Sequence, residues 1–425
     1  MKKALQSFFV VIFCLAYSLP AFSNMDDWHG FVELDYGVKL NSDTTKRDDF
    51  NLLEQRLQLK YAHYFEGENY LSRKGAAFNF KGDFTVDEYY AARTNFDIRE
   101  VNLSLSPLDK VDVKIGRQVL TWGTGDYLFV NDLFPKDYKS FFIGRSDEYL
   151  KKPSDAIKFS FFPSAFNVDF IVARFEQNTI AQGERLSHYD PFRSMIAGRE
   201  NSRELIEPAF RMSNNEYALR AYRYVNSNEV AFYYFNGFDK NPSSFKDEAA
   251  RQLFFRRLDV YGTSVRSPIA SGIGNIEFGY YHSREDSDGT DRLIPNSMIK
   301  TLLGYERDLG NDLKVGVQYL YEQRLNYGHY QENLLSGDLI FDEMRHLLTQ
   351  RVTKQYKNQT VTVSLFNFVS PTDKDGYVRP SVIYDLNDRW KITLGANIPW
   401  GEDEFSEFGQ MKRNKNIFTR VRYSF

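Results

Sequence analysis

The chain of 425 residues has almost no cysteine and no apolar run long enough to cross a membrane as a helix. Its one cysteine, Cys14, lies in an apolar stretch near the N-terminus, so we expect no disulfide and no thiol chemistry in the mature chain. Charged residues make up 26% of the chain and the mean hydropathy is −0.50, which excludes a helical membrane protein.

Signs of enzyme chemistry are also scarce. There are 6 histidines, and none has the spacing of a zinc site. The sequence has no Gly-x-Ser-x-Gly elbow, no P-loop and no dinucleotide fingerprint. Ser187 and His188 lie near Asp190, but residues adjacent in sequence seldom form a nucleophile and base pair. We therefore expect no enzyme activity, no metal and no cofactor.

What the chain does have is alternation of apolar and polar residues, together with 37 Phe and 28 Tyr. In the last ten residues, Arg420 and Arg422 alternate with apolar Ile417, Val421 and Tyr423. Side chains of a strand alternate between its two faces, so this segment has one apolar and one charged face. Such a strand belongs at the edge of a soluble sheet or in a membrane barrel whose lumen is wet.

The same alternation recurs along the chain in segments of about ten residues, which is the pattern of a transmembrane barrel. We predict an all-β, closed antiparallel barrel of about eighteen strands, with sixteen as the alternative. The predicted strands are Trp28–Leu40, Leu53–Phe65, Ala76–Glu88, Asn95–Ser106, Val111–Thr121, Ala156–Phe162, Phe166–Phe175, Glu216–Val225, Glu229–Asn236, Arg257–Ser267, Asn275–Arg284, Met298–Glu306, Leu313–Arg324, Arg345–Thr353, Thr360–Phe368, Tyr377–Leu386, Trp390–Ile398 and Asn416–Phe425.

One strand of this set has an alternative interpretation. Leu339–Val352 also fits an amphipathic helix, but that interpretation leaves an odd number of strands. Single-chain bacterial barrels have an even number, which favours a strand at Arg345–Thr353 after a loop that is itself partly helical. Short and long connections alternate between the predicted strands, as expected for short periplasmic turns and long extracellular loops.

Residues 1–23 have the pattern of a secretory signal peptide, with Lys2 and Lys3 before an apolar stretch and small residues Ala21 and Ser23. We predict cleavage after Ser23 and a single barrel domain at 24–425. Removing the two lysines leaves 52 Lys and Arg against 57 Asp and Glu, a net charge of −5. This mild acidity argues against a nucleic-acid partner.

Strict alternation assigns many charged side chains to the lumen. An arginine facing lipid at mid-bilayer costs roughly 2–4 kcal/mol in a barrel, so these side chains should face inward. The predicted pore-lining residues are Arg56, Lys60, Lys114, Arg117, Lys158, Arg220, Lys314, Arg324, Lys391, Arg420, Arg422, Glu33, Glu54 and Glu100. Arg117 qualifies only if a bulge at Gly116 turns it inward, because alternation groups it with Val113 and Ile115.

The excess of cations in this set predicts a lumen that attracts anions. The alternative is that these charges pair across neighbouring strands and only hold the wall in shape. The tryptophans Trp28, Trp122, Trp390 and Trp400 fit the aromatic girdles at the two membrane interfaces.

The long connection Trp122–Asp155 is rich in aromatic residues, so we expect it to pack rather than to remain free. One hypothesis is that it folds into the barrel and narrows the pore, with Asp126, Asn131, Asp132 and Arg145 at the constriction. The alternative is an outer cap packed on neighbouring loops. Deleting the connection should raise the conductance only in the first case.

The signal peptide, the alternating strands and the terminal aromatic Phe425 resemble Gram-negative outer-membrane porins. That resemblance implies insertion by the barrel-assembly machinery, which reads Phe425, and a place in the lipid of the outer membrane. Two shorter motifs, Ile115-Gly116-Arg117-Gln118 and Ser370-Pro371-Thr372-Asp373-Lys374-Asp375-Gly376-Tyr377, are similar to the alginate-export porin family. This narrower resemblance implies eighteen strands and an arginine-lined lumen, but the substrate does not carry over.

The expected function is therefore an outer-membrane channel for diffusion or export of small or polymeric hydrophilic solutes, anions above all. An export role would involve a periplasmic or inner-membrane partner. The alternatives are a barrel enzyme, such as a protease or phospholipase, and a surface receptor or adhesin built on the long loops.

Overall fold

The computed structural model of the chain describes residues 28–41, 50–65, 67, 75–90, 93–179, 185–197, 204–249 and 251–425. The predicted signal peptide and its cleavage site lie outside the described residues. Among the described residues, no helix is both long enough and apolar enough to cross a membrane.

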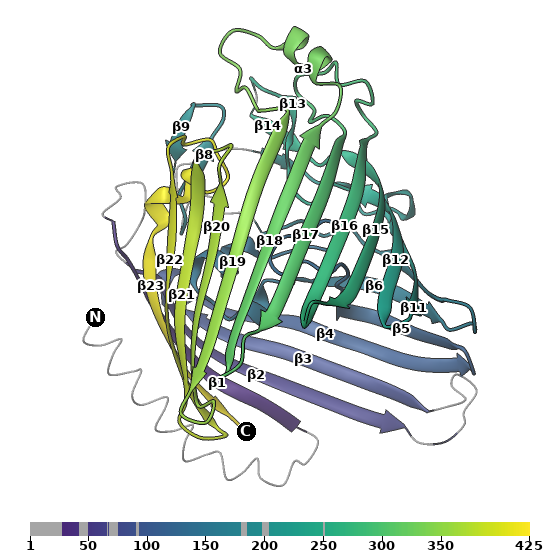
Figure 1. Ribbon diagram of the computed structural model, residues 1–425, viewed down its shortest axis with the longest axis vertical. Helices are drawn as coiled ribbons and strands as arrows, with labels where there is room; N and C mark the ends of the chain where they lie inside the picture. The colour runs from purple at the N-terminus through teal and green to yellow at the C-terminus, as the bar shows by residue number, and fades with distance from the viewer. Residues whose placement is uncertain are drawn as a thin grey trace.

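Eighteen antiparallel strands form one sheet that closes on itself, because the first strand pairs with the last (Figure 1). In chain order the barrel strands are β1 (Trp28–Lys39), β2 (Phe50–Phe65), β3 (Ala76–Asp87), β4 (Arg93–Leu108), β5 (Val111–Val119), β6 (Pro153–Phe161), β7 (Asn167–Ala173), β11 (Glu216–Val225), β12 (Asn228–Phe238), β15 (Arg257–Ile269), β16 (Gly272–Ser283), β17 (Met298–Asp308), β18 (Leu313–Arg324), β19 (Met344–Tyr356), β20 (Val361–Ser370), β21 (Asp375–Asp385), β22 (Trp390–Gly401) and β23 (Asn416–Ser424).

The eighteen predicted strands are confirmed, and the alternative of sixteen is wrong. The ambiguous segment is strand β19, which pairs with β18 and β20, and the connection before it contains the short helix α3 (Tyr327–Asn333). The prediction ended the strand before β16 too early, since the β15–β16 ladder continues to Ile269 and Gly272. Closure removes the exposed strand edges that a bilayer would not tolerate.

Short turns join the strands at one end of the barrel, called here the turn end. Asn226 and Ser227 join β11 to β12, and Ala270 and Ser271 join β15 to β16, all four with positive φ. Two consecutive residues with positive φ match the twist of paired strands, which allows these two-residue connections. The last residue, Phe425, exchanges two backbone hydrogen bonds of 3.0 Å with Gly30, so the chain ends by closing the barrel at this end.

Longer connections lie at the opposite end, the loop end, and carry the smaller elements (Figure 1). They contain a hairpin of β8 (His188–Asp190) and β9 (Met195–Ala197), and a three-stranded sheet of β10 (Glu204–Ile206), β14 (Gln252–Phe254) and β13 (Ser244–Asp247). The helical pieces are η2 (Glu88–Tyr90), α2 (Tyr138–Ile143), η3 (Asp147–Tyr149), η4 (Met212–Asn214), α3 and η5 (Gly409–Asn414). Both α2 and η3 belong to the connection between β5 and β6.

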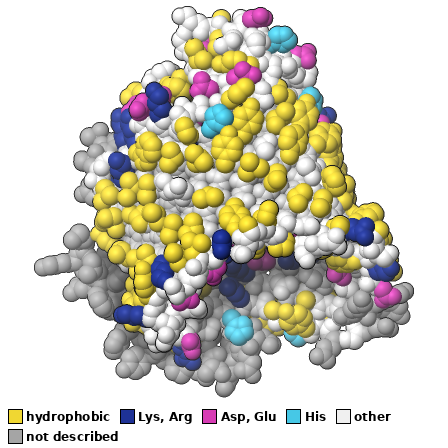
Figure 2. Space-filling view, viewed as in Figure 1, with side chains coloured by type: hydrophobic (Ala, Val, Ile, Leu, Met, Phe, Trp, Pro, Cys, Tyr) yellow, Lys and Arg dark blue, Asp and Glu magenta, His cyan; other side chains and the backbone are white. Residues whose placement is uncertain are grey.

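The outer wall is apolar, as the alternation predicts. Figure 2 shows hydrophobic side chains spread across the strands that face the viewer, with most charged side chains toward the two ends. Tyr234, Tyr261 and Tyr280 lie directly opposite one another on β12, β15 and β16, and their rings are 5.2 and 6.4 Å apart. At the turn end, Trp28 contacts Tyr61 at 4.9 Å. Aromatic rows of this kind mark the two membrane interfaces.

Three of the four tryptophans have the outward position expected of a girdle residue, and Trp122 does not. Trp122 packs against Phe134 and Tyr233 with ring separations of 5.1 and 5.9 Å, and Tyr233 is a buried, inward-facing residue of β12. The girdle prediction for Trp122 is therefore wrong. The residue follows the end of β5, where the chain turns into the barrel and the strand alternation no longer applies.

Candidate functional site: a lumen crossed by an inner loop

The connection between β5 and β6, residues 120–152, lies inside the barrel and is called here the inner loop. Its side chains and backbone contact inward-facing residues of strands on opposite sides of the lumen. Helix α2 gives it local structure: Asp137 caps the start by accepting a hydrogen bond from Ser140 N, at 3.0 Å. Gly144 ends α2 with a φ of 95°, and a Cβ there would lie 2.4 Å from the Phe418 ring. Only glycine permits this turn and this close approach.

One side of the lumen is an apolar seat for the inner loop. The loop residues Leu128, Val130, Phe141 and Leu150 are buried in one cluster with inward-facing residues of β17 to β21, namely Leu302, Leu320, Leu347, Phe366, Phe368 and Tyr377. The sequence analysis predicts a lumen lined by charged side chains. That expectation is wrong for this side, because the inward faces of these strands carry apolar residues that the loop covers.

A single carboxylate fixes the first part of the inner loop. Glu277, a buried residue of β16, accepts hydrogen bonds from the backbone N–H groups of Thr124, Gly125 and Asn131, and also from the Asn131 side chain at 2.9 Å. Charge-assisted hydrogen bonds of this type are about twice as strong as neutral ones. Glu277 therefore holds the point at which the loop leaves the wall of β5.

Arginines of the final strand hold the far part of the inner loop. Arg420 donates a 2.6 Å hydrogen bond to the carbonyl oxygen of Gly144, and Arg422 lies 2.9 Å from the Glu148 carboxylate. Both arginines also pair with carboxylates of β1: Arg420 with Asp35 at 2.9 Å and Arg422 with Glu33 at 2.6 Å. The strands β23, β1, β2 and β3 at the level of these pairs are called here the anchored wall.

The charge of Glu148 depends on this wall. Burial by itself would raise the pKa of the Glu148 carboxyl, but Arg422 and Lys81 outweigh burial and hold the pKa below its usual range. Tyr149 follows it in the chain and lies between two guanidinium groups, those of Arg56 at 4.2 Å and Arg99 at 4.7 Å from the ring centroid. The loop is thus held by ion pairs and by cation–π contacts.

The four residues predicted for a constriction all lie in the inner loop, and they have different surroundings. Asp126 pairs with Arg351 at 3.0 Å, and burial raises its pKa although Arg351 acts in the opposite direction. Asn131 binds Glu277, and Asp132 pairs with Lys136 of the same loop at 3.0 Å. Arg145 donates to Glu54 of β2 at 2.9 Å. Asp132 therefore supports the loop internally, while Asn131 and Arg145 attach it to the wall.

Most of the predicted pore-lining cations face inward, and all of these except Lys60 and Arg324 have a carboxylate within 4.0 Å. The shortest nitrogen to oxygen distances are Arg56–Asp83 3.1 Å, Lys114–Glu100 3.9 Å, Lys158–Asp169 3.2 Å, Arg220–Glu229 2.5 Å, Lys314–Glu306 2.7 Å and Lys391–Asp385 3.2 Å. Arg324 instead lies over the rings of Tyr330 and Phe341, at 4.8 and 5.3 Å. Much of the lumen charge is therefore neutralised by neighbouring side chains.

Lysines on β2 to β6 form a different surface, called here the lysine wall. Lys60 lies directly opposite Lys81 on β2 and β3, and Lys114 lies directly opposite Lys158 on β5 and β6. Within the described part of the chain, Lys60 has no ion pair. Like charges placed directly opposite one another destabilise a sheet, and the carboxylates of Glu148, Glu100 and Asp169 offset part of this repulsion.

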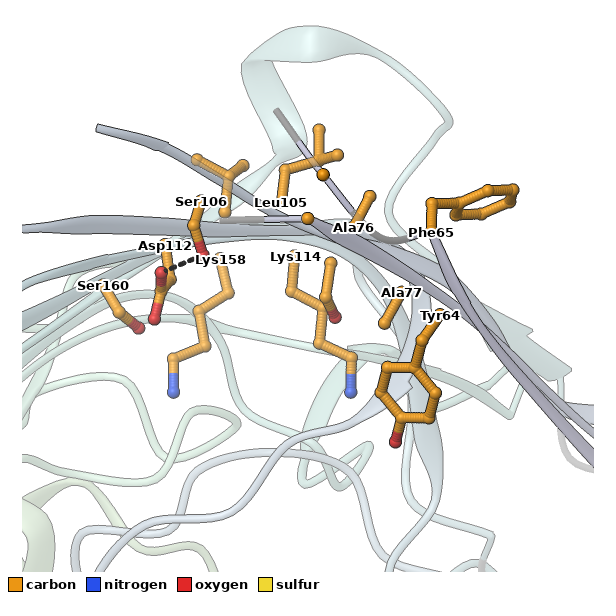
Figure 3. Close-up of a pocket in the computed structure, with 14 residues that line it drawn as sticks. Tyr64, Phe65, Ala76, Ala77, Leu105, Ser106, Asp112, Lys114, Lys158 and Ser160 are labelled. Carbon is orange, nitrogen blue, oxygen red and sulfur yellow. Dashed lines mark hydrogen bonds between the residues drawn. The ribbon is translucent and has the colours of Figure 1, made fainter. Parts of the chain in front are cut away.

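Two of these lysines line a cavity of about 580 Å³ at the turn end, together with Tyr64, Ser106, Asp112 and Ser160 (Figure 3). In Figure 3 the ammonium groups of Lys114 and Lys158 point to one side of the sheet, while Phe65 and Leu105 lie on the other. The Lys114 and Lys158 side chains are 34% and 29% exposed, so both keep contact with solvent.

Arg117 does not line the lumen. It pairs in register with Val101 and Asp155, on the same outward face as Ile115, and forms an ion pair of 3.1 Å with Asp155. Gly116 has a φ of 119°, but the pairing of β5 with its two neighbours shows no shift at this point. The predicted pore-lining role is wrong for Arg117, because the bulge that it required does not occur.

A bulge does occur in β4, where it brings an unpredicted arginine into the lumen. Lys81 pairs with Glu100 and Gly82 pairs with Ile98, so Arg99 is an extra residue and points inward beside Glu100. Its guanidinium donates to the carbonyl oxygen of Lys151 at 2.8 Å. Alternation alone could not find Arg99. It could have found Arg345, Arg351 and Arg379, which face inward on strands predicted correctly.

In the described ranges, no group of three or more His, Cys, Asp or Glu side chains is placed to hold a metal ion. The scan against protein-family models finds no match, and the search of curated proteins finds none either.

Solved structures match this chain over most of its length. OccAB3 of Acinetobacter baumannii is 10% identical, covers 94% of this chain and 98% of its own, and has a TM-score of 0.53. OmpT of Vibrio cholerae (9% identity, 94% and 98% coverage, TM-score 0.42) and a mutant of the Rh. blastica porin (10%, 94% and 99%, 0.43) also match. At these identities the likeness to OccAB3 shows the fold alone, and the narrower resemblance to alginate-export porins is not shown. The chain thus shares with OccAB3 the fold of a large, closed antiparallel β-barrel.

Proposed function

We propose that the barrel is a passive channel for small hydrophilic solutes and that it favours anions. The observation that carries the anion preference is the lysine wall, where Lys60 faces Lys81 and Lys114 faces Lys158 across neighbouring strands. Cations gathered in a narrow aqueous space raise the local concentration of anions. Lys81, Lys114 and Lys158 each have a carboxylate nearby, as most other cations of the lumen do, so the expected preference is mild.

The position of the inner loop favours the passage of small solutes over that of polymers. It contacts the apolar seat on β17 to β21 and the anchored wall, so it crosses the lumen between them. A cavity of about 210 Å³, lined by Asp126, Arg266, Glu306 and Arg351, lies directly beside the loop, and the lysine-lined cavity lies at the turn end. Diffusion past the loop needs no catalytic group, no cofactor and no export partner. The proposal includes insertion by the barrel-assembly machinery.

Current through the purified protein in planar lipid bilayers tests this function. We expect discrete conductance steps and, in a KCl gradient, a reversal potential on the anion-selective side. The double variant Lys114→Gln/Lys158→Gln should move the reversal potential toward that of a non-selective pore. Lys374→Gln is the matched control, because Lys374 is 65% exposed at the loop end and lies outside the lysine wall.

Two results would count against the proposal. Absence of conductance steps from a correctly folded barrel would exclude a channel. Cation selectivity in the unaltered protein, or equal shifts in the double variant and the control, would exclude the lysine wall as the source of an anion preference.

A further inference from the structure

We propose that Glu54 is a positioning residue that couples the inner loop to a second, outer segment, residues 185–197, which comes from the connection between β7 and β11. This inference rests on the proposed channel function and adds a part of the molecule that the function itself does not require. The carboxylate of Glu54 is completely buried on β2 and accepts from arginines of three separate segments.

The three arginines share the two oxygens of the same carboxylate. Arg56, from β2 itself, lies 3.2 Å from Oε2. Arg145, from the inner loop, donates its Nε to Oε2 at 2.9 Å and its Nη2 to Oε1. Arg185, from the outer segment, donates its Nη1 to Oε1 at 3.0 Å. The two loops therefore share one acceptor atom, Oε1, so the loss of one guanidinium changes the charge balance at the carboxylate that holds the other.

Arg185 is fixed on its other side as well. Its Nη2 pairs with Asp87 at the end of β3, so the guanidinium bridges the carboxylates of two neighbouring strands. The Arg185 side chain is only 2% exposed. A guanidinium can make such a bridge because its donors are held in a rigid, planar fork. The outer segment is thus attached to the barrel wall at the same place as the inner loop.

Apolar side chains pack beside the ion pairs of Glu54. Leu186 of the outer segment and Ile143 of the inner loop are buried in one cluster with Leu52 of β2 and Phe418 of β23. Next to it, Ser187 donates its backbone N–H and its hydroxyl to Asn414, at 2.8 and 3.0 Å. Displacing the outer segment would therefore remove one ion pair from Glu54 and the packing of Leu186 against Ile143 of the inner loop.

The consequence is a connection between the outer segment at the loop end and the inner loop inside the barrel. A change that withdraws Arg185 from Glu54 weakens the attachment of the outer segment and alters the charge balance around Arg145. The inner loop should then sample positions away from the anchored wall. Because Glu54 joins the two loops, its removal should abolish the effect of Arg185 on the inner loop.

Hydrogen exchange of the inner-loop amides in the folded, detergent-solubilised barrel tests this coupling without any measurement of current. We expect Arg185→Gln to speed exchange in residues 138–150 about tenfold, since a segment opens more readily when its ion pairs and packing are weakened. Arg193→Gln is the matched control: Arg193 lies in the same outer segment, pairs with Asp190 at 3.6 Å, and should leave the inner loop unchanged.

The decisive variant is Glu54→Gln/Arg185→Gln. If Glu54 couples the two loops, the effect of Arg185→Gln disappears in the Glu54→Gln background, because interactions in one network do not add. Equal effects of Arg185→Gln and Arg193→Gln, or strictly additive effects in the double variant, would overturn the coupling. A barrel that shows this coupling but carries no current would overturn the channel function alone.

Discussion

The anchored wall and the lysine wall use the same residue types for opposite purposes. On the anchored wall, opposite charges face one another: Glu33 lies across from Arg422, and Asp35 from Arg420. On the lysine wall like charges face one another, and the side chains of Lys114 and Lys158 stay partly exposed. Removing one partner of a buried ion pair leaves an uncompensated buried charge and destabilises the fold. Replacing a solvent-exposed lysine changes the stability little. The first wall holds the inner loop, and the second, apart from the Lys81–Glu148 pair, is the surface that we propose for solutes.

The anchored wall holds the inner loop in the lumen. Removing the inner loop should therefore have the largest effect on the channel. Replacing residues 124–148 by a short Gly-Ser linker should raise single-channel conductance at least about twofold, because a barrel of this size without a plug encloses an aqueous channel. Unchanged conductance in bilayers, with a barrel that still folds, would mean that the loop does not limit the current.

Loosening the loop without deleting it should have the next largest effect. Glu277→Ala leaves the backbone N–H groups of Thr124, Gly125 and Asn131 without their acceptor. Each buried group left unpaired costs roughly 1–3 kcal/mol, so denaturant unfolding in detergent should report a clear loss of stability and the open-channel current should become noisier. Glu306→Ala removes a partly exposed carboxylate that pairs with Lys314, and its smaller effect is the control.

A charge reversal on the lysine wall should change selectivity and leave the loop in place. Lys60→Glu introduces a carboxylate opposite Lys81, where the two can form a cross-strand pair. The reversal potential in a salt gradient should move toward cation selectivity, by less than in the Lys114 and Lys158 double variant. A loss of stability comparable with that of Glu277→Ala would show that Lys60 belongs to the anchoring machinery.

The smallest effect is expected on the outer face. Arg117→Gln should leave conductance and reversal potential unchanged, because Arg117 lies outward and pairs with Asp155. A measurable shift in reversal potential would place this arginine in the lumen and would mean that the division of the barrel into inward and outward faces is wrong at β5.

Alternation by itself determined the architecture. A strand has a period of two, and a barrel gives lipid to one face and the lumen to the other, so residues such as Arg420 and Val421 reveal their faces without any tertiary information. For this reason all eighteen strands, the closed topology and the inward direction of Arg56, Arg220 and Arg422 could be predicted. The same rule placed Arg117 with Ile115, and only the assumed bulge contradicted it.

Tertiary structure decided what fills the lumen. The two-residue period of a strand gives no sign of a bulge, so the sequence analysis misses Arg99. The period also does not apply to connections, which is why the girdle prediction for Trp122 is wrong. The contacts of Glu54 with Arg145 and Arg185 join residues 91 and 131 positions apart, and no local pattern encodes such a distance. The face to which a strand side chain points follows from its position in the local sequence. The position of the inner loop depends instead on partners that only barrel closure brings together.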